Sequence, residues 1–329
     1  MKFLFRRLVP LCPAFILIGR IPYFDIRHSL FDTYSPPEED SIFAFKTFYL
    51  RSASIGRAQK HITHERTETQ MMDLAPCKQT AIAAAYKAAE ILRLRLGNIS
   101  QIRKKDAVEI VTEADIESEQ AIISAIRTRF PEHSILSEEA GLNEGNDEFR
   151  WVIDPLDGTV NFAHQVPIFC ISIALTYQDD MVLGVVLNPV DGQLYTALRG
   201  QGAQLNGRPI QVSEATAVSE SLLVTGFPYH IREIFEPIMT RYGNCLQASQ
   251  AVRRLGSAAL DLCYVACGRF EGFWEQCLKP WDTAAGALIA SEAGATVTTF
   301  SNQPYQLGDQ EILVTNGHIH DEMIGLLEL

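Results

Sequence analysis

The chain is 329 residues long, which leaves room for two domains or for one large domain with a sizeable core. Hydrophobic residues make up 47% of the sequence, so the composition is that of a globular protein and not of a disordered one. The formal net charge of -12 argues against a generic nucleic-acid binder, because such proteins present a basic face.

The chain contains seven cysteines and no Cys-x-x-Cys pair. Cys263 and Cys267 stand four residues apart on an expected helix, beside apolar residues. Buried free thiols are the favoured interpretation of this pattern, and a zinc site is the second. Free thiols are typical of a reducing compartment, so we expect a cytoplasmic protein.

Residues 1–70 carry no clean helical or strand period and are expected to form a weakly ordered extension outside the catalytic fold. Their apolar stretch, 8–19, is too short and too interrupted by prolines for a membrane span, and we expect no membrane association. The acidic residues at 38–40 are untypical of a transit peptide. Export or organelle targeting stays a minor alternative, and Met71 and Met72 offer a second start immediately before the first clear helix.

From residue 71 to residue 214 the pattern predicts an α+β part with antiparallel hairpins. Apolar residues recur twice at helical spacing, and shorter apolar runs between turn residues indicate strands. The expected helices cover 77–96 and 117–130, and the expected strands cover 107–112, 134–136, 169–177, 181–188, 193–197 and 203–205. A polar loop is expected between residues 141 and 150.

From residue 215 to residue 329 strand and helix patterns alternate, which predicts an α/β part. The expected strands cover 221–225, 251–255, 272–275, 296–300 and 312–315, and the expected helices cover 232–241, 257–267, 281–292 and 320–327. We therefore expect two halves after the extension, 71–214 and 215–329.

The run Trp151–Phe162 contains the most informative pattern of the chain. Its apolar start ends at Asp154, and Asp157 follows after a proline that is expected to end strand pairing. Two neighbouring acids repel each other unless a proton or a cation lies between them, and oxygen ligands suit Mg²⁺. Gly158 and Thr159 then offer backbone N–H groups and a hydroxyl to an anion. A cation beside an anion site is what phosphate-ester chemistry requires.

Three further acids lie at the ends of apolar runs: Asp115, Glu138 and Asp282. Any one of them alone would be interpreted as a helix cap or a solvated loop residue. Together with Asp154 and Asp157 they favour a metal site.

Five segments resemble those of the inositol monophosphatase family, within the lithium-sensitive, Mg²⁺-dependent sugar-phosphatase superfamily. They are 109–115, 137–139, 151–162, 256–261 and 281–286, in the family's order and at roughly its spacing. The Asp-Pro-Leu-Asp-Gly-Thr and Trp-Asp-Thr-Ala-Ala-Gly motifs are highly specific. The resemblance extends from about residue 75 to the end of the chain. It implies a layered α-β-α-β-α sandwich of the inositol monophosphatase and fructose-1,6-bisphosphatase type, a metal site between the two halves, and a homodimer.

The resemblance also implies a set of metal ligands for two to three Mg²⁺ ions. The first ion would be held by Glu138, Asp154 and the backbone carbonyl of Leu156. The second ion would be held by Asp154, Asp157 and Asp282. A third, weaker ion would lie against Glu138 and water, which places this residue among the catalytic ones.

The remaining roles concern the attacking water and the substrate. The resemblance implies that Asp115 and Thr159 orient the water, and that Gly158 and Thr159 bind the phosphate. Ala258 would line the substrate pocket, and Glu275 would accept hydrogen bonds from ring hydroxyls of a phosphorylated polyol.

Three departures from the family pattern remove no proposed ligand. They are Ser137 in place of a glycine, Val160 in place of a second threonine, and Ala295 in place of a second glycine.

The expected function is Mg²⁺-dependent, lithium-sensitive hydrolysis of inositol monophosphate to myo-inositol and phosphate, by direct attack of a metal-activated water. Rival substrates are histidinol phosphate, fructose 1,6-bisphosphate, adenosine 3',5'-bisphosphate and NADP, which relatives with the same metal motifs could accept. A non-catalytic interaction protein of the RNA or transcription machinery is the alternative from another class.

Overall fold

The computed structural model describes residues 73–99, 102–104, 110–143 and 145–329, which all belong to one compact unit. The predicted extension over residues 1–70 lies outside the described residues. Among the helices of the described part, none is long and apolar enough to cross a membrane. The cysteines of this part are free, as the sequence predicted, and Cys12 lies outside it.

Two helices, α1 (Ala75–Arg95) and α2 (Glu113–Arg129), pack against each other and against one face of a sheet. Helix α2 begins four residues earlier than expected. The reason is a capping box: the hydroxyl of Thr112 accepts from the N–H of Ala114, and Asp115 accepts from the N–H of Thr112. Asp115 therefore lies in the first turn of the helix and not in the loop before it.

The larger sheet has the strand order β10-β9-β8-β7-β6-β5-β3-β4 and is antiparallel except between β3 and β5. Its strands are β3 (His133–Ser137), β4 (Gly141–Asn143), β5 (Asn146–Asp157), β6 (Cys170–Tyr177), β7 (Asp180–Asn188), β8 (Gln193–Leu198), β9 (Ala203–Leu205) and β10 (Arg208–Ile210). A small hairpin of β1 (Ile102–Lys104) and β2 (Ile110–Thr112) precedes α2. The loop expected between residues 141 and 150 instead contains β4 and the start of β5.

Strand β5 does not end at Pro155, contrary to the sequence prediction. Asp154 lies opposite Ser172 and Asp157 lies opposite Cys170, so three steps along β5 match two along β6. The proline is accommodated in this bulge, where a missing N–H costs no regular ladder bond. The short helix α3 (Thr159–Ala163) follows directly.

The smaller sheet has the order β12-β11-β13-β15-β14, with β12, β11 and β13 parallel. Its strands are β11 (Leu222–Thr225), β12 (Ala251–Arg253), β13 (Gly272–Gln276), β14 (Thr296–Thr298) and β15 (Glu311–Thr315). Its helices are α4 (Phe235–Ala248), α5 (Ala258–Ala266), α6 (Pro280–Glu292) and α7 (His320–Leu327), with 3-10 turns at Val218–Glu220 and Ile231–Glu233.

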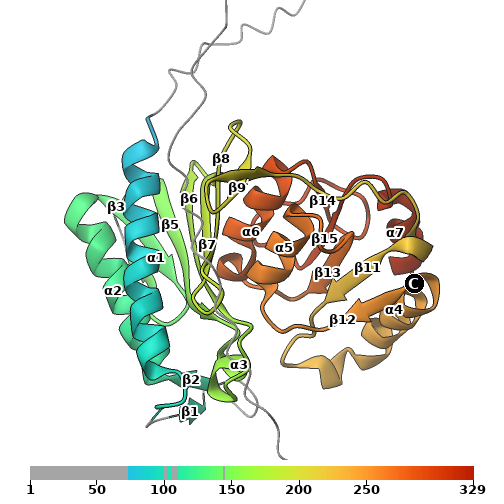
Figure 1. Cartoon of the computed structure of the whole chain (residues 1–329), viewed down its shortest axis with the longest axis horizontal. Coiled ribbons are helices and arrows are strands. Elements are labelled where there is room, and N and C mark those ends of the chain that lie inside the picture. Colours follow the sequence, from blue (N-terminus) through green and yellow to red (C-terminus); the bar gives the residue numbers. More distant parts are fainter. Residues whose placement is uncertain (1–72, 100–101, 105–109, 144) are drawn as a thin grey trace, which may run out of the picture. The chain divides into compact units, whose positions relative to one another are not determined.

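These elements form five layers (Figure 1). One apolar cluster joins α1 and α2 to the larger sheet, a second joins α5 and α6 to both sheets, and a third joins α4 and α7 to the outer face of the smaller sheet. The layered α-β-α-β-α sandwich expected from the resemblance is therefore the fold of the described chain.

Helix α6 is held close to both of its neighbours by glycines. A Cβ on Gly286 would lie 2.7 Å from Cδ1 of Leu262 on α5, and a Cβ on Gly184 of β7 would lie 2.7 Å from the carbonyl oxygen of Ala285. Larger side chains at these positions would push α6 away. The close packing fixes the position of the α6 N-terminus, which carries Asp282.

Candidate active site

Four acids from three segments approach each other in the described part of the chain. Asp154 and Asp157 lie in the bulged end of β5, Glu138 follows β3, and Asp282 lies in the first turn of α6. Burial raises the pKa of Asp154 well above its usual value, and the charges of Glu138, Asp157 and Asp282 raise it further. These four residues, which come from distant parts of the sequence, are close enough to interact electrostatically and are called the acid cluster below.

Each aspartate of the cluster has one oxygen committed to the protein. The Oδ1 atom of Asp154 accepts from the N–H of Leu156 at 3.0 Å. The Oδ2 atom of Asp282 accepts from the N–H of Lys279 at 2.7 Å, in the capping geometry that begins α6. These bonds fix the orientation of the carboxylates, and the second oxygen of each is the one that a cation would contact.

Asp157 accepts more hydrogen bonds than Asp154 or Asp282. Its Oδ2 accepts from the hydroxyl of Ser257 at 2.7 Å and from the N–H of Ala259 at 2.8 Å, and the thiol of Cys170 lies 3.7 Å away. Burial raises the pKa of Asp157, while the bonds from Ser257 and Ala259 act in the opposite direction. The start of α5 thus ties the second half of the fold to the end of β5.

Asp115 and Thr159 form the predicted pair beside this cluster. The Thr159 hydroxyl lies 3.0 Å from Oδ1 of Asp115 and 3.1 Å from the carbonyl oxygen of Leu156, so its single proton can be donated to either. Asp115 is fully buried, which raises its pKa to about 6 despite hydrogen bonds from Thr112 and Thr159.

Glu138 is supported by a residue that sequence reasoning missed, the buried Glu119 of α2. The Oε1 atom of Glu119 accepts hydrogen bonds from the Ser137 hydroxyl and, at 3.0 Å each, from the N–H groups of Glu139 and Ala140. The turn that carries Glu138 is therefore fixed from α2. Ser137, a departure from the family pattern, points its hydroxyl at Glu119. The spacing of Asp115 and Glu119, four residues apart on one helix face, is the signal that could have revealed it.

Gly158 begins α3 with a φ of +98°, a conformation that favours glycine. A Cβ at this position would also lie 3.0 Å from the carbonyl oxygen of Ile168. The tight turn leaves the first N–H groups of α3, those of Thr159 and its successor, outside the helical hydrogen bonds. Of these two donors, the N–H of Thr159 is one expected from the sequence to bind a phosphate group, together with the N–H of Gly158.

Asn161 is a second residue whose importance sequence reasoning missed. Its Nδ2 lies 2.7 Å from the carbonyl oxygen of Ile168, 2.8 Å from that of Leu255 and 3.4 Å from that of Gly256. One side chain therefore ties α3 to the turn before α5. Its partners lie as far as 95 residues away along the chain, so no local pattern points to it.

The predicted substrate residues lie in the second half of the fold. Ala258 is the first residue of α5, and Glu275 lies near the end of β13 with 7% of its surface exposed. Burial raises the pKa of Glu275 to about 8, Asp282 adds to the shift, and Arg254 opposes it. Asp261 of α5 is buried, and its Oδ1 has no hydrogen-bond partner among the described residues.

The donor set of the acid cluster fits a hard divalent cation. Its ligands would be carboxylate oxygens whose mutual repulsion a cation would relieve, and Leu156, whose carbonyl is the further expected ligand, lies in the bulge between Asp154 and Asp157. Within the described ranges, no three His, Cys, Asp or Glu side chains are already gathered around one point.

Comparison with known proteins decides the family. The model of the inositol monophosphatase family matches residues 73–328. The chain belongs to this family. The family is one of phosphatases and is generally Mg²⁺-dependent. The match begins after the predicted extension and includes every predicted site residue.

Individual relatives agree with this assignment. An inositol-1-monophosphatase of Synechocystis is 45% identical over 254 residues, which cover 76% of this chain and 88% of the relative. The Nus factor SuhB of Pseudomonas aeruginosa is 41% identical over 253 residues, covering 75% and 91%. The structure of the inositol monophosphatase from Anabaena superposes with a TM-score of 0.71 at 41% identity, covering 78% of this chain and 96% of that one.

Proposed function

We propose that this protein is an Mg²⁺-dependent phosphatase that hydrolyses inositol monophosphate to myo-inositol and phosphate. The observation that carries the proposal is the convergence of Glu138, Asp154, Asp157 and Asp282. Burial and the charges of neighbouring acids raise the pKa of Asp154 and of Asp282, and a cation between the carboxylates would relieve the repulsion. The 45% identity to an inositol-1-monophosphatase supports the substrate class.

The acid cluster would hold two to three Mg²⁺ ions. Glu138, Asp154 and the Leu156 carbonyl would bind the first, and Asp154, Asp157 and Asp282 the second, with Glu138 also serving a third. When bound, Mg²⁺ makes a water molecule more acidic and stabilises the negative charge that develops on the ester oxygens. Burial of the carboxylates raises the free energy of their charged forms, so each gains from a bound cation.

Asp115 and Thr159 would position the attacking water. With its pKa at about 6, Asp115 is mostly ionised at neutral pH, and its Oδ1 accepts a hydrogen bond from the Thr159 hydroxyl. That hydroxyl oxygen can then accept a hydrogen bond from the water and so orient its lone pair. Water would attack phosphorus directly, so the P–O bond to the alcohol breaks without a phosphorylated side chain.

The substrate would be held at both ends. The N–H groups at Gly158 and Thr159 would donate to the phosphate oxygens. Ala258 would leave space for the ring, and Glu275 would accept hydrogen bonds from its hydroxyls. Histidinol phosphate, fructose 1,6-bisphosphate, adenosine 3',5'-bisphosphate and NADP stay rival substrates, because they could use the same acid cluster.

A hydrolysis panel with Mg²⁺ titration and lithium tests this proposal. We expect the highest kcat/KM for inositol 1-phosphate, inhibition by lithium, and a loss of roughly 100-fold or more in the Asp154→Asn and Asp282→Asn variants. Asp191→Asn, at an exposed aspartate in the turn between β7 and β8, serves as the matched control. A higher kcat/KM for histidinol phosphate would contradict the substrate, and unchanged activity of Asp154→Asn would contradict the metal site.

The similarity to a Nus factor favours one second function. A relative with that name is 41% identical, so a role in binding the transcription machinery is the alternative for this chain. Failure of the wild type to release phosphate from any ester in Mg²⁺ would favour it.

We further propose that the protein is a cytoplasmic homodimer and that residues 1–70 precede two halves that meet near residue 214.

A further inference from the structure

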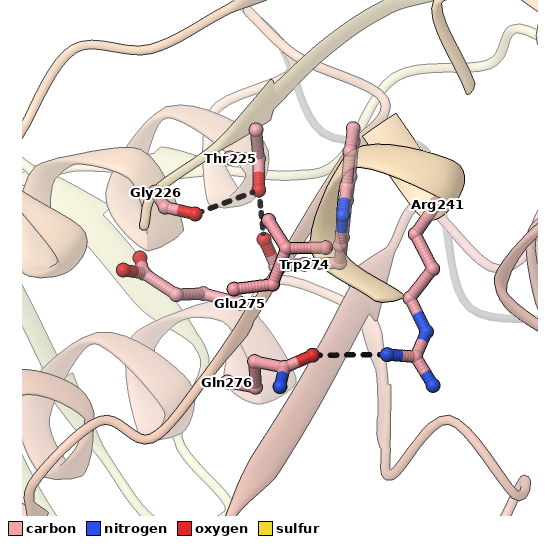
Figure 2. A pocket seen from close by; sticks show the side chains of 7 residues that line it. Thr225, Gly226, Arg241, Trp274, Glu275 and Gln276 are labelled. Atoms are coloured by element: carbon pink, nitrogen blue, oxygen red, sulfur yellow. Dashed lines mark hydrogen bonds between the residues drawn. The ribbon is translucent and has the colours of Figure 1, made fainter. Parts of the chain in front are cut away.

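A glycine lies against the predicted ring-binding acid. Gly226 follows β11, and Glu275 lies on the neighbouring parallel strand β13. Figure 2 shows the Glu275 carboxylate beside Gly226, whereas the next side chain, Gln276, points away towards Arg241. A Cβ on Gly226 would overlap both carboxylate oxygens of Glu275, well inside the 3.0 Å that Cβ atoms essentially never cross.

The backbone on both sides of this contact is fixed. Thr225 pairs with Trp274 in the parallel register, and its buried hydroxyl donates to the Trp274 carbonyl at 2.6 Å. Trp274 is itself packed in the apolar cluster beneath α4 and α7. A methyl group at position 226 would therefore displace the far end of Glu275, because this flexible side chain gives way more easily than two paired strands.

The surroundings of Glu275 determine where a displaced carboxylate can go. Its charge is disfavoured by burial and by Asp282 and Asp157, and it is favoured by Arg254. The nearby Asp261 is also buried and acidic. Movement towards these acids is electrostatically unfavourable. A displaced carboxylate would therefore move away from them and leave the position that it now holds.

We infer that Gly226 is a specificity-determining position: it leaves the space that the Glu275 carboxylate needs in order to meet the substrate's ring hydroxyls. This inference rests on the proposed function, which gives Glu275 its hydroxyl contacts. Gly226 touches neither the acid cluster nor the Asp115–Thr159 pair in the described contacts, so it acts on substrate choice through Glu275.

The test is a double-mutant cycle. The measured quantity is the kcat/KM for inositol 1-phosphate divided by the kcat/KM for 4-nitrophenyl phosphate, which has no ring hydroxyls. Gly226→Ala should lower this ratio roughly tenfold, the effect of losing one hydrogen bond. Gly243→Ala, where a Cβ meets nothing within 4 Å, should leave it within about twofold of the wild type. In a Glu275→Ala background, Gly226→Ala should lower the ratio no further.

An unchanged ratio in a folded Gly226→Ala variant, or additive losses in the double variant, would overturn the inference. If Gly226→Ala is too unstable for kinetic measurements, the same cycle is measured by thermal unfolding. Adding Glu275→Ala should then restore the Tm that Gly226→Ala lowers. A double variant as unstable as Gly226→Ala would again overturn it. Failure of the proposed function can be told apart from failure of this inference. In the first case the wild type itself shows no preference for inositol 1-phosphate, which is measured before any variant is made.

Discussion

Glu275 combines burial with carboxyl oxygens to which the substrate's hydroxyls would donate. Its pKa of about 8 in the folded chain lies above the ordinary value of 4.5, because burial and Asp282 disfavour the carboxylate. Between these two pH values the folded state therefore binds more protons than the unfolded state. Linkage then requires that the free energy of unfolding falls as the pH rises through this window.

We expect the Glu275→Gln variant of the metal-free protein to lose less stability than the wild type between about pH 4.5 and pH 8. The Tm difference should grow with pH and level off above pH 8, with roughly 2–4 °C for each kcal/mol in a domain of this size. Thermal unfolding in a chelating buffer measures it. Glu90→Gln, an exposed substitution on α1, should keep the wild-type slope. Parallel curves for Glu275→Gln and the wild type would contradict the pKa shift.

How far single residues could be predicted depends on whether their partners are local. Asp154, Asp157 and Asp282 were found because each lies in a short, specific motif, and the structure places them in one cluster. Glu119 and Asn161 were not found. Their partners lie 18 to 21 and 7 to 95 residues away, so their importance depends on the fold and not on a pattern around them.

Among the elements, the turn from β5 into α3 shows how backbone conformation determines a site. Gly158 has a φ of +98°, and a Cβ there would also crowd Ile168, Phe169 and Gly256. Gly308 has a φ of +101°, but a Cβ there would meet nothing within 4 Å. The two glycines separate the cost of the conformation from the cost of the close approach.

We expect Gly308→Ala to destabilise the protein by about 1–2 kcal/mol, the cost of the left-handed conformation alone. Gly158→Ala should cost more, because neighbouring backbone atoms must also shift, and it should reduce phosphate hydrolysis. Chemical denaturation and kcat/KM for inositol 1-phosphate measure both effects. Equal destabilisation by the two substitutions would show that the contacts of Gly158 are unimportant.

The element boundaries were predicted less well than the elements themselves. The start of α2 was placed four residues late because the Thr112–Asp115 capping box was not taken into account. Helix α4 extends to Ala248 and not to residue 241. Pro155 was expected to end β5, but tertiary pairing with β6 continues past it through a bulge. Local sequence does not reveal such a bulge, because its register is set by a partner strand.

At the scale of the whole molecule, the site depends on contacts between the end of β5, with α3, and the start of α5. The layered order followed from the family resemblance, whereas the strand order of each sheet is visible only in the structure. Asp157 reaches Ser257 and Ala259, and Asn161 reaches Leu255 and Gly256. These bonds hold the start of α5 against the end of β5, and so bring acids from both halves together.

Asn161→Asp tests the second of these links with almost no change in shape. The substitution replaces an amide donor, which faces the carbonyl oxygens of Ile168 and Leu255, by an oxygen that can only accept. The lost bonds and the new repulsion should cost roughly 2–4 kcal/mol, because hydrogen-bonding groups are left unpaired in a half-buried place. We expect a lower Tm together with weaker Mg²⁺ activation, since the α5 start that fixes Asp157 would shift.

Asn302→Asp, in an exposed turn, introduces the same charge away from these contacts and should leave both quantities near their wild-type values. If Asn161→Asp lowered the Tm without changing the Mg²⁺ concentration for half-maximal activity, the link would stabilise the fold without positioning the acids. A change in both, absent from Asn302→Asp, is the outcome expected if the geometry of the acid cluster depends on how the halves are joined. In that case the Asp-Pro-Leu-Asp-Gly-Thr motif is completed by Asn161, which lies only two residues beyond it but acts through a turn almost one hundred residues away.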